Sequence, residues 1–204
     1  MSVLPLVFTS GWACGINAYA VVLLLGFFGA TGLSDDVPET LQRPEVLIIA
    51  GVLFLCESVA DKIPYVDSVW DSVHTVVRPV AGAWVGALLA GHSGSLSDVA
   101  AGLIGGSTAL ASHTVKAGTR MAVNTSPEPF SNIVLSFAED LGVGAIVSFA
   151  MFHPLAAAII AAVLLATGLI VLVFLISRIR RFWRRRAQRR EERRLATQVG
   201  GPPG

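Results

Sequence analysis

The chain has 204 residues, of which 53% are hydrophobic and 14% are charged. This composition is too apolar for a soluble domain, and it indicates a membrane protein. The formal net charge of +1 hides an asymmetry, because ten of the fifteen basic residues lie between Arg178 and Arg194. Before Arg178 the chain has five bases against twelve acidic residues, which argues against nucleic acid as a partner.

Six apolar runs approach the length of about 20 residues that a membrane-spanning helix needs. They are residues 12–33, 46–60, 80–91, 99–112, 130–152 and 155–176. The second, third and fourth runs are short and rich in glycine and alanine, which favours tilted or re-entrant helices that pack closely. We therefore expect an all-α, polytopic membrane protein with about six transmembrane or re-entrant helices.

The basic residues predict the topology and the domain boundaries. If all six runs cross and both termini are cytoplasmic, fourteen bases lie inside and only Arg43 lies outside. This predicts a multi-pass protein of the plasma membrane. The membrane domain would cover residues 1–177, with halves at about 1–91 and 99–177. The arginine-rich tail, 178–204, would be helical at its start and then disordered.

Six spans divide into three and three, so the second half would enter the membrane from the opposite side, as in transporters with inverted repeats. Short matches between the halves favour such a repeat. CGINAY from Cys14 resembles AGTRMA from Ala117, and Glu57 corresponds to Glu139. The matches are few and their spacings differ, so chance similarity stays open as the alternative.

Two segments carry ionisable residues at helical spacing. Asp67, Asp71, His74 and Arg78 are four, three and four residues apart, and His113, Lys116, Arg120 and Asn124 are three, four and four apart. Each set lies within roughly 60° to 80° on a helix. One interpretation is a pair of re-entrant segments that line a polar cavity. The other is a pair of surface amphipathic helices with polar faces toward the cytoplasm.

Further carboxylates lie inside or beside the apolar runs. Glu57 and Asp61 are four residues apart, and the pair Glu139-Asp140 lies about ten residues into the fifth run. A charged side chain at the bilayer centre costs about 2.5 to 3.5 kcal/mol, so these groups must face each other or water. Buried carboxylates would take up protons unless a base such as Lys116 or Arg120 pairs with them. A coupling site for protons and structural ion pairs between helices are the two interpretations.

The sequence lacks the motifs of common enzymes and metal sites. It contains no GxSxG, Walker A, HExxH or CxxC sequence. We therefore expect no catalytic residue, no bound metal and no cofactor. The tail, with Phe182 and Trp183 among its arginines, is typical of a topology anchor that binds anionic lipid head groups.

Three segments resemble a known family: GINAYAVVLLLG from Gly15, ESVADKIPYVDSVWDSVHTVVRPVAGA from Glu57, and HTVKAGTRMAVNTSPEPFSNIVLSFAED from His113. This family is domain of unknown function 4126, which comprises bacterial integral membrane proteins. The resemblance covers nearly the whole chain up to the last run, and it implies a membrane location and a shared polar core without an assigned activity. The residues that match its polar motifs are Glu57, Asp61, Lys62, Asp67, Asp71, His74, Arg78, Lys116, Arg120, Asn124, Glu128, Glu139 and Asp140.

Our first hypothesis is a small transporter or flippase for an anionic or lipid-like substrate, coupled to protons. The substrate would be bound by Arg78, His113, Lys116, Arg120 and Asn124. Protons would be carried by Glu57, Asp61, Asp67, Asp71, His74, Glu139 and Asp140.

Two other classes of function stay open. A non-catalytic scaffold would use its basic tail to bind anionic lipid or a partner protein, and an intramembrane enzyme would act on a lipid phosphate. The small body and its glycine-lined helix faces are also compatible with a homodimer.

Overall fold

The structure, a computed structural model, describes residues 3–63, 65–123 and 129–199. These residues form seven helices and no strand, which confirms the all-α expectation. The helices are α1 (Leu4–Ala30), α2 (Glu39–Gln42), α3 (Pro44–Ala60), α4 (Val66–Ser93), α5 (Asp98–Val123), α6 (Pro129–Phe152) and α7 (Pro154–Val199). The chain divides into two units, Met1–Gly168 and Leu169–Gly204.

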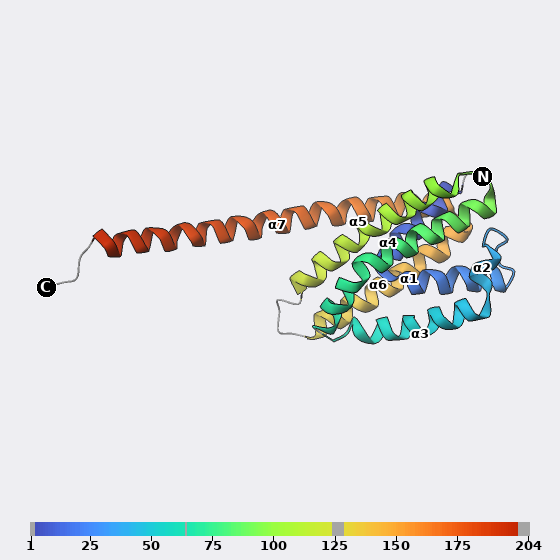
Figure 1. Cartoon of the computed structure of the whole chain (residues 1–204), viewed down its shortest axis with the longest axis horizontal. Coiled ribbons are helices and arrows are strands. Elements are labelled where there is room, and N and C mark those ends of the chain that lie inside the picture. Colours follow the sequence, from blue (N-terminus) through green and yellow to red (C-terminus); the bar gives the residue numbers. More distant parts are fainter. Residues whose placement is uncertain (1–2, 64, 124–128, 200–204) are drawn as a thin grey trace. The chain divides into compact units, whose positions relative to one another are not determined.

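Helix α1 is the centre of the first unit. It is apolar on all sides, and 17 of its 27 residues are buried. A helix with this pattern is stable only when other helices surround it. Helices α2, α3, α4, α5 and α6 all pack against α1 (Figure 1). Lys116 of α5, His74 of α4 and Asp140 of α6 contact the middle of α1, at Ile16, Tyr19 and Asn17 respectively.

Helices α4 and α5 approach each other through glycines. A Cβ atom placed on Gly82 would lie 2.8 Å from the carbonyl oxygen of Gly105, and one on Gly11 of α1 would lie 2.6 Å from the same atom. Gly86 is equally close to the backbone of Ala101. Small residues allow such close approach in membrane helices. The expectation that the glycine-rich runs pack closely is confirmed here.

Helix α4 buries its charged face and exposes its apolar face. Asp67, Asp71, His74 and Arg78 are at most 5% exposed, whereas Val69, Val73 and Val76 are between 59% and 68% exposed. This is the reverse of a helix at the surface of a soluble protein. The interpretation of this segment as a surface amphipathic helix is therefore wrong.

The re-entrant interpretation also needs correction. The polar segment 67–78 and the apolar run 80–91 form one continuous helix, α4, with Pro79 inside it. The segment 113–120 likewise continues the run 99–112 within α5. A proline normally marks a helix end in sequence analysis, but neighbouring helices compensate for the lost hydrogen bond inside a membrane bundle.

Within the described part of the chain, four helices are long and apolar enough to cross a membrane, which indicates a multi-pass membrane protein. They are Leu4–Ala30, Val66–Ser93, Ile133–Phe152 and Pro154–Gln188. The expected number was about six. Helix α3 has 17 residues and is short for a hydrocarbon core of about 30 Å, and α5 carries its basic residues in its second half.

In the second unit, α7 continues to Val199, so the tail is helical well beyond the start that we expected. The side chains of residues 178–188 are exposed, including Phe182 and Trp183.

The close approach of α4 and α5 predicts a strong effect of a single methyl group. We expect Gly82→Ala to lower the free energy of unfolding by about 1 to 3 kcal/mol, because the new Cβ would overlap Gly105 and Ala109. The control is Gly144→Ala, since a Cβ there meets nothing within 4 Å. Both variants gain helix propensity equally. Thermal unfolding of the purified proteins in detergent measures the difference, and equal midpoints would contradict the packing argument.

Candidate functional site

Ionisable side chains from four helices converge beside the middle of α1. Glu57 lies in α3 and Asp61 caps its C-terminal end. The others come from α4 (Asp67, Asp71, His74, Arg78), α5 (His113, Lys116, Arg120) and α6 (Glu139, Asp140). Eight ion pairs connect eight of these residues, and we call these eight the ionic network: Glu57, Asp61, Asp67, Asp71, Arg78, Lys116, Arg120 and Glu139.

Arg78 is the first centre of the ionic network. Its Nη2 donates to Glu57 Oε1 at 2.5 Å, and its Nη1 donates to Asp71 Oδ1 at 3.0 Å. The Arg78 side chain has no exposed surface. A buried guanidinium is stable only with carboxylates placed this well, because desolvation of a charge is expensive. Arg78 thereby ties α3 to α4.

Lys116 and Arg120 form the second centre, around Asp61 and Glu139. Lys116 Nζ donates to Asp61 Oδ2 at 2.8 Å, and Arg120 Nη2 donates to Glu139 Oε2 at 2.6 Å. Arg120 Nη1 also donates to the carbonyl oxygen of Asp61 at 2.8 Å and lies 3.7 Å from Asp67 Oδ1. These contacts join α5 to α6 and to the C-terminal end of α3.

Glu57 connects the two centres. Its Oε1 atom accepts from Arg78 and lies 3.6 Å from Lys116 Nζ. Its other oxygen, Oε2, is buried and has no hydrogen-bond partner among the residues that the structure describes. An unpaired carboxylate oxygen in a buried position is a site that a proton or a cation would stabilise.

The hydrogen bonds of the two histidines determine their protonation. His113 Nδ1 lies 2.6 Å from Arg78 Nη1, which can only donate, so Nδ1 is unprotonated and the ring is neutral. His74 Nδ1 lies 2.8 Å from the carbonyl oxygen of Trp70 and must carry a proton. Its Nε2 is 2.9 Å from the hydroxyl of Tyr19 on α1. In this arrangement His113 bonds to Arg78 and, through Nε2, lies 3.1 Å from the hydroxyl of Thr75, whereas His74 has the hydroxyl of Tyr19 as its partner.

Helix α1 is broken where it meets the ionic network. Asn17 has φ −149° and ψ 96°, which are not helical values. Its Oδ1 accepts from the backbone N–H of Ala20 at 2.9 Å and so caps the second half of α1. The carbonyl oxygen of Ile16, at the end of the first half, accepts from Lys116 Nζ at 3.0 Å. The ammonium group thus stabilises a carbonyl that the break leaves free.

Asn17 also connects the break to α6. Its Nδ2 donates to Asp140 Oδ1 at 2.9 Å. Asp140 therefore bonds to α1, whereas the adjacent Glu139 bonds to the bases of α5, and the two carboxylates are not a proton-sharing pair. Sequence reasoning missed Asn17 and Tyr19 as site residues. The segment GIN at Gly15, with glycine and asparagine inside an apolar run, was the pattern that indicates such a break.

The ionic network contains more acid than base. It holds five carboxylates and three basic groups, and His113 beside it is neutral. An excess of carboxylates over bases is unfavourable in a low-dielectric region, and a bound proton or cation would lower its energy. Among the described residues, no group of three or more metal-ligating side chains is placed to hold a metal ion.

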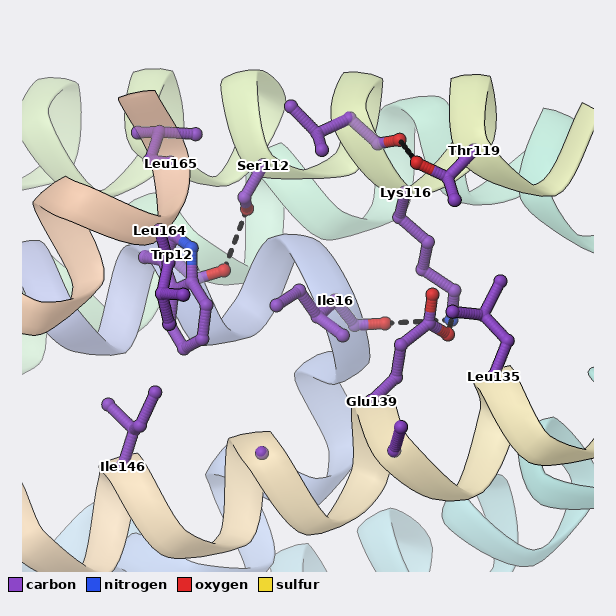
Figure 2. Close-up of a pocket in the computed structure, with 13 residues that line it drawn as sticks. Trp12, Ile16, Ser112, Lys116, Thr119, Leu135, Glu139, Ile146, Leu164 and Leu165 are labelled. Atoms are coloured by element: carbon purple, nitrogen blue, oxygen red, sulfur yellow. Dashed lines mark hydrogen bonds and ion pairs between the residues drawn. The ribbon is translucent and has the colours of Figure 1, made fainter. Parts of the chain in front are cut away.

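A pocket of about 300 Å³ ends at the ionic network. Figure 2 shows Lys116 and Glu139 together at one end, near Ile16, and Trp12, Ile146, Leu164 and Leu165 at the other. The walls come from α1, α5, α6 and the start of α7. Lys116 and Glu139 are the charged members of its lining as far as the structure describes the chain. This is the combination of an apolar wall and a few polar groups that small-molecule sites use.

Most of the residues that the sequence singled out thus lie together. Asp140 and His74 touch α1 beside the ionic network, and His113 touches Arg78. Asn124, which we expected to bind substrate, lies outside the described residues.

The burial of Arg78 predicts a large cost for its removal. We expect Arg78→Leu to lower the free energy of unfolding by about 3 to 5 kcal/mol, because Glu57 and Asp71 would lose their cation. Glu57→Gln in the same chain should restore part of the loss. Arg43→Leu is the control, since the pair of Arg43 and Glu45 is exposed, and it should have little effect. Equal thermal midpoints for Arg78→Leu and Arg43→Leu would refute this account.

The bond between Asn17 and Asp140 predicts a rescue by exchange. Asn17→Asp keeps the oxygen that caps Ala20 but places a carboxylate against Asp140. We expect a loss of about 1 to 3 kcal/mol in unfolding free energy. The double variant Asn17→Asp with Asp140→Asn should recover most of it, because the donor and acceptor simply change places. Thermal unfolding of the single and double variants is the measurement, and a double variant no better than the single one would exclude the contact.

Comparison with known proteins agrees with this architecture. The family described as Domain of unknown function (DUF4126) matches residues 4–174, which include every helix of the first unit and all residues of the ionic network. No curated protein and no solved structure matches the chain. The match covers most of the chain, and the protein belongs to the family Domain of unknown function (DUF4126).

Proposed function

We propose that the protein is a small membrane transporter or flippase that carries an amphiphilic, lipid-like substrate and couples this movement to protons. The observation that carries the proposal is the pocket of about 300 Å³ that ends on Lys116 and Glu139 of the ionic network. An apolar site next to buried charges is what a carrier needs in order to bind a substrate and respond to its charge.

The depth of the charges supports a functional role. Helix α4 presents Val69, Val73 and Val76 outward and Asp71 and Arg78 inward. A helix with this distribution suits lipid outside and a polar interior. Ionisable groups inside a membrane are costly, and they mark ion or substrate pathways more often than they serve packing alone.

The break in α1 supports the same proposal. Transporters commonly place their sites at discontinuous helices, whose free carbonyl and N–H groups contact ions and substrates. Here the break at Asn17 lies between Lys116 and Asp140. A helix interrupted at this point also has a place to bend between two states of the carrier.

The three bases do not favour an anionic substrate. Arg78 has two carboxylate partners, and Lys116 and Arg120 have three each. An anion would have to displace these partners and would add negative charge to a group with excess acid. Of the two substrate classes that the sequence suggested, anionic and lipid-like, we therefore propose the lipid-like one.

Proton coupling follows from the excess of acid. Glu139 is the acidic group of the ionic network with the largest exposure, 14%, and it lines the pocket. A proton on Glu139 would weaken its bond to Arg120 and change the charge at the end of the pocket. The charged groups around Glu139 are Lys116 and Arg120 from α5, Glu57 and Asp61 from α3 and its cap, and Asp140 from α6.

The topology remains part of the proposal. Six crossings with both termini in the cytoplasm place α1, α3 and α4 in one half and α5, α6 and α7 in the other. In that arrangement Glu57 and Glu139 occupy corresponding helices, and each lies 3.6 Å from Lys116 Nζ. The same contact from both halves favours an inverted repeat.

The test measures flux in proteoliposomes. The probes are fluorescent alkyl chains that differ only in their end group, which is an ammonium, a hydroxyl or a carboxylate. We expect the protein to accelerate crossing of at least one probe over protein-free vesicles, and a transmembrane pH gradient to change this rate. Glu139→Gln and Arg120→Gln should lower the rate to that of protein-free vesicles, since they alter the pair at the end of the pocket.

Asp35→Asn is the matched control, because it also replaces a carboxylate by an amide but at an exposed position. It should transport like the unmodified protein, and the other two variants must elute as the same folded species in size-exclusion chromatography. If no probe crosses faster than in protein-free vesicles, the carrier proposal fails.

A further inference from the structure

We infer that the pocket selects a lipophilic monovalent cation, which is an apolar body that carries one positive charge. The inference rests on the proposed function, because it specifies the substrate class of the same site. It reverses the sign of the charge that the basic residues suggested in the sequence.

The bases of the ionic network are already neutralised. Among the residues that the structure describes, Lys116 is the only base that lines the pocket, and its side chain is 2% exposed. It bonds to Asp61 Oδ2 at 2.8 Å and to the Ile16 carbonyl at 3.0 Å. Its Nζ also lies 3.6 Å from both Glu57 and Glu139. This ammonium therefore has little remaining capacity to attract an anion.

Glu139, the acid that lines the pocket, is more accessible to a ligand than Lys116 is. Glu139 has the most exposed side chain in the ionic network, at 14%. Its ion pairs with Arg120 and Lys116 both use Oε2. Because the ionic network has five carboxylates for three bases, a cation at the end of the pocket would offset its excess of acid. A cation that enters lowers the energy of this charge distribution, and an anion raises it.

The remaining walls indicate the chemistry of the cation. Leu135, Ile146, Leu164 and Leu165 provide an apolar surface, and Trp12 adds an aromatic ring. Apolar walls do not compensate for the hydration shell of a small inorganic ion, but they suit a cation whose charge is covered by hydrocarbon. The volume of about 300 Å³ fits a small organic molecule.

The test uses two probes of nearly the same shape and opposite charge, tetraphenylphosphonium and tetraphenylborate. Each is titrated onto the full-length protein in nanodiscs, with protein-free nanodiscs as the background. We expect saturable binding of tetraphenylphosphonium and none of tetraphenylborate. Glu139→Gln should weaken tetraphenylphosphonium binding by at least about tenfold, because it removes the charge that faces the cation.

A second variant tests the pocket without changing its charge. Ile146→Phe fills the apolar end, away from the ionic network, and should also weaken tetraphenylphosphonium binding. Leu141→Ala is its control on the same helix, since Leu141 is 73% exposed, and should bind like the unmodified protein. Variants are compared only after their thermal midpoints have shown that they fold.

The outcomes separate this inference from the transport proposal. Tetraphenylborate binding in preference to tetraphenylphosphonium, or binding of neither, overturns the inference even if the vesicle assay detects flux. Binding of tetraphenylphosphonium that is unchanged in both Glu139→Gln and Ile146→Phe also overturns it, because the cation then binds elsewhere. Binding lost in both variants with no flux of any probe supports the cation site and removes the transport proposal.

Discussion

The contact of Glu57 with both Arg78 and Lys116 is the constraint on which the rest of the first unit depends. It joins two groups of charges that would each be too costly to bury alone. Because the partners come from α3, α4 and α5, satisfying them fixes how these helices are rotated. Once the charged faces point inward, the valines of α4 face outward. The same ion pairs between α3, α4 and α5 therefore account for both the polar interior and the apolar exterior.

The glycines and the break in α1 make this arrangement geometrically feasible. Close approach of α4 and α5 at Gly82 and Gly105 leaves α1 within reach of their side chains. Asn17 interrupts α1 at the level of the ionic network, and Lys116 bonds to the carbonyl of Ile16 that this break releases. A continuous α1 would offer Lys116 no free carbonyl there. The break is thus both a product of the charges and a support for them.

In the fold, the basic residues of α5 have a different role from the one that the sequence suggested. In the sequence, Lys116 and Arg120 suggest a site for an anion, but in the fold their charges are balanced by carboxylates from three other segments. What remains beside the pocket is an excess of acid with Glu139 at its edge. Whether a binding site favours a cation or an anion depends on the sum of the neighbouring charges rather than on the residues of one helix. This is why the proposed substrate is a cation.

The amino-acid sequence was enough to identify the class of the protein. Its apolar runs predicted an all-α membrane protein, and the helical spacing of Asp67 to Arg78 and of His113 to Arg120 placed each polar set on one helix face. Periodicity cannot tell whether such a face meets water or other helices, because the pattern is the same in both cases. It is the fold that shows these faces buried against one another. The fold also determines that Asn17 breaks α1, since a local backbone change of this kind depends on partners such as Asp140, 123 residues away in the chain.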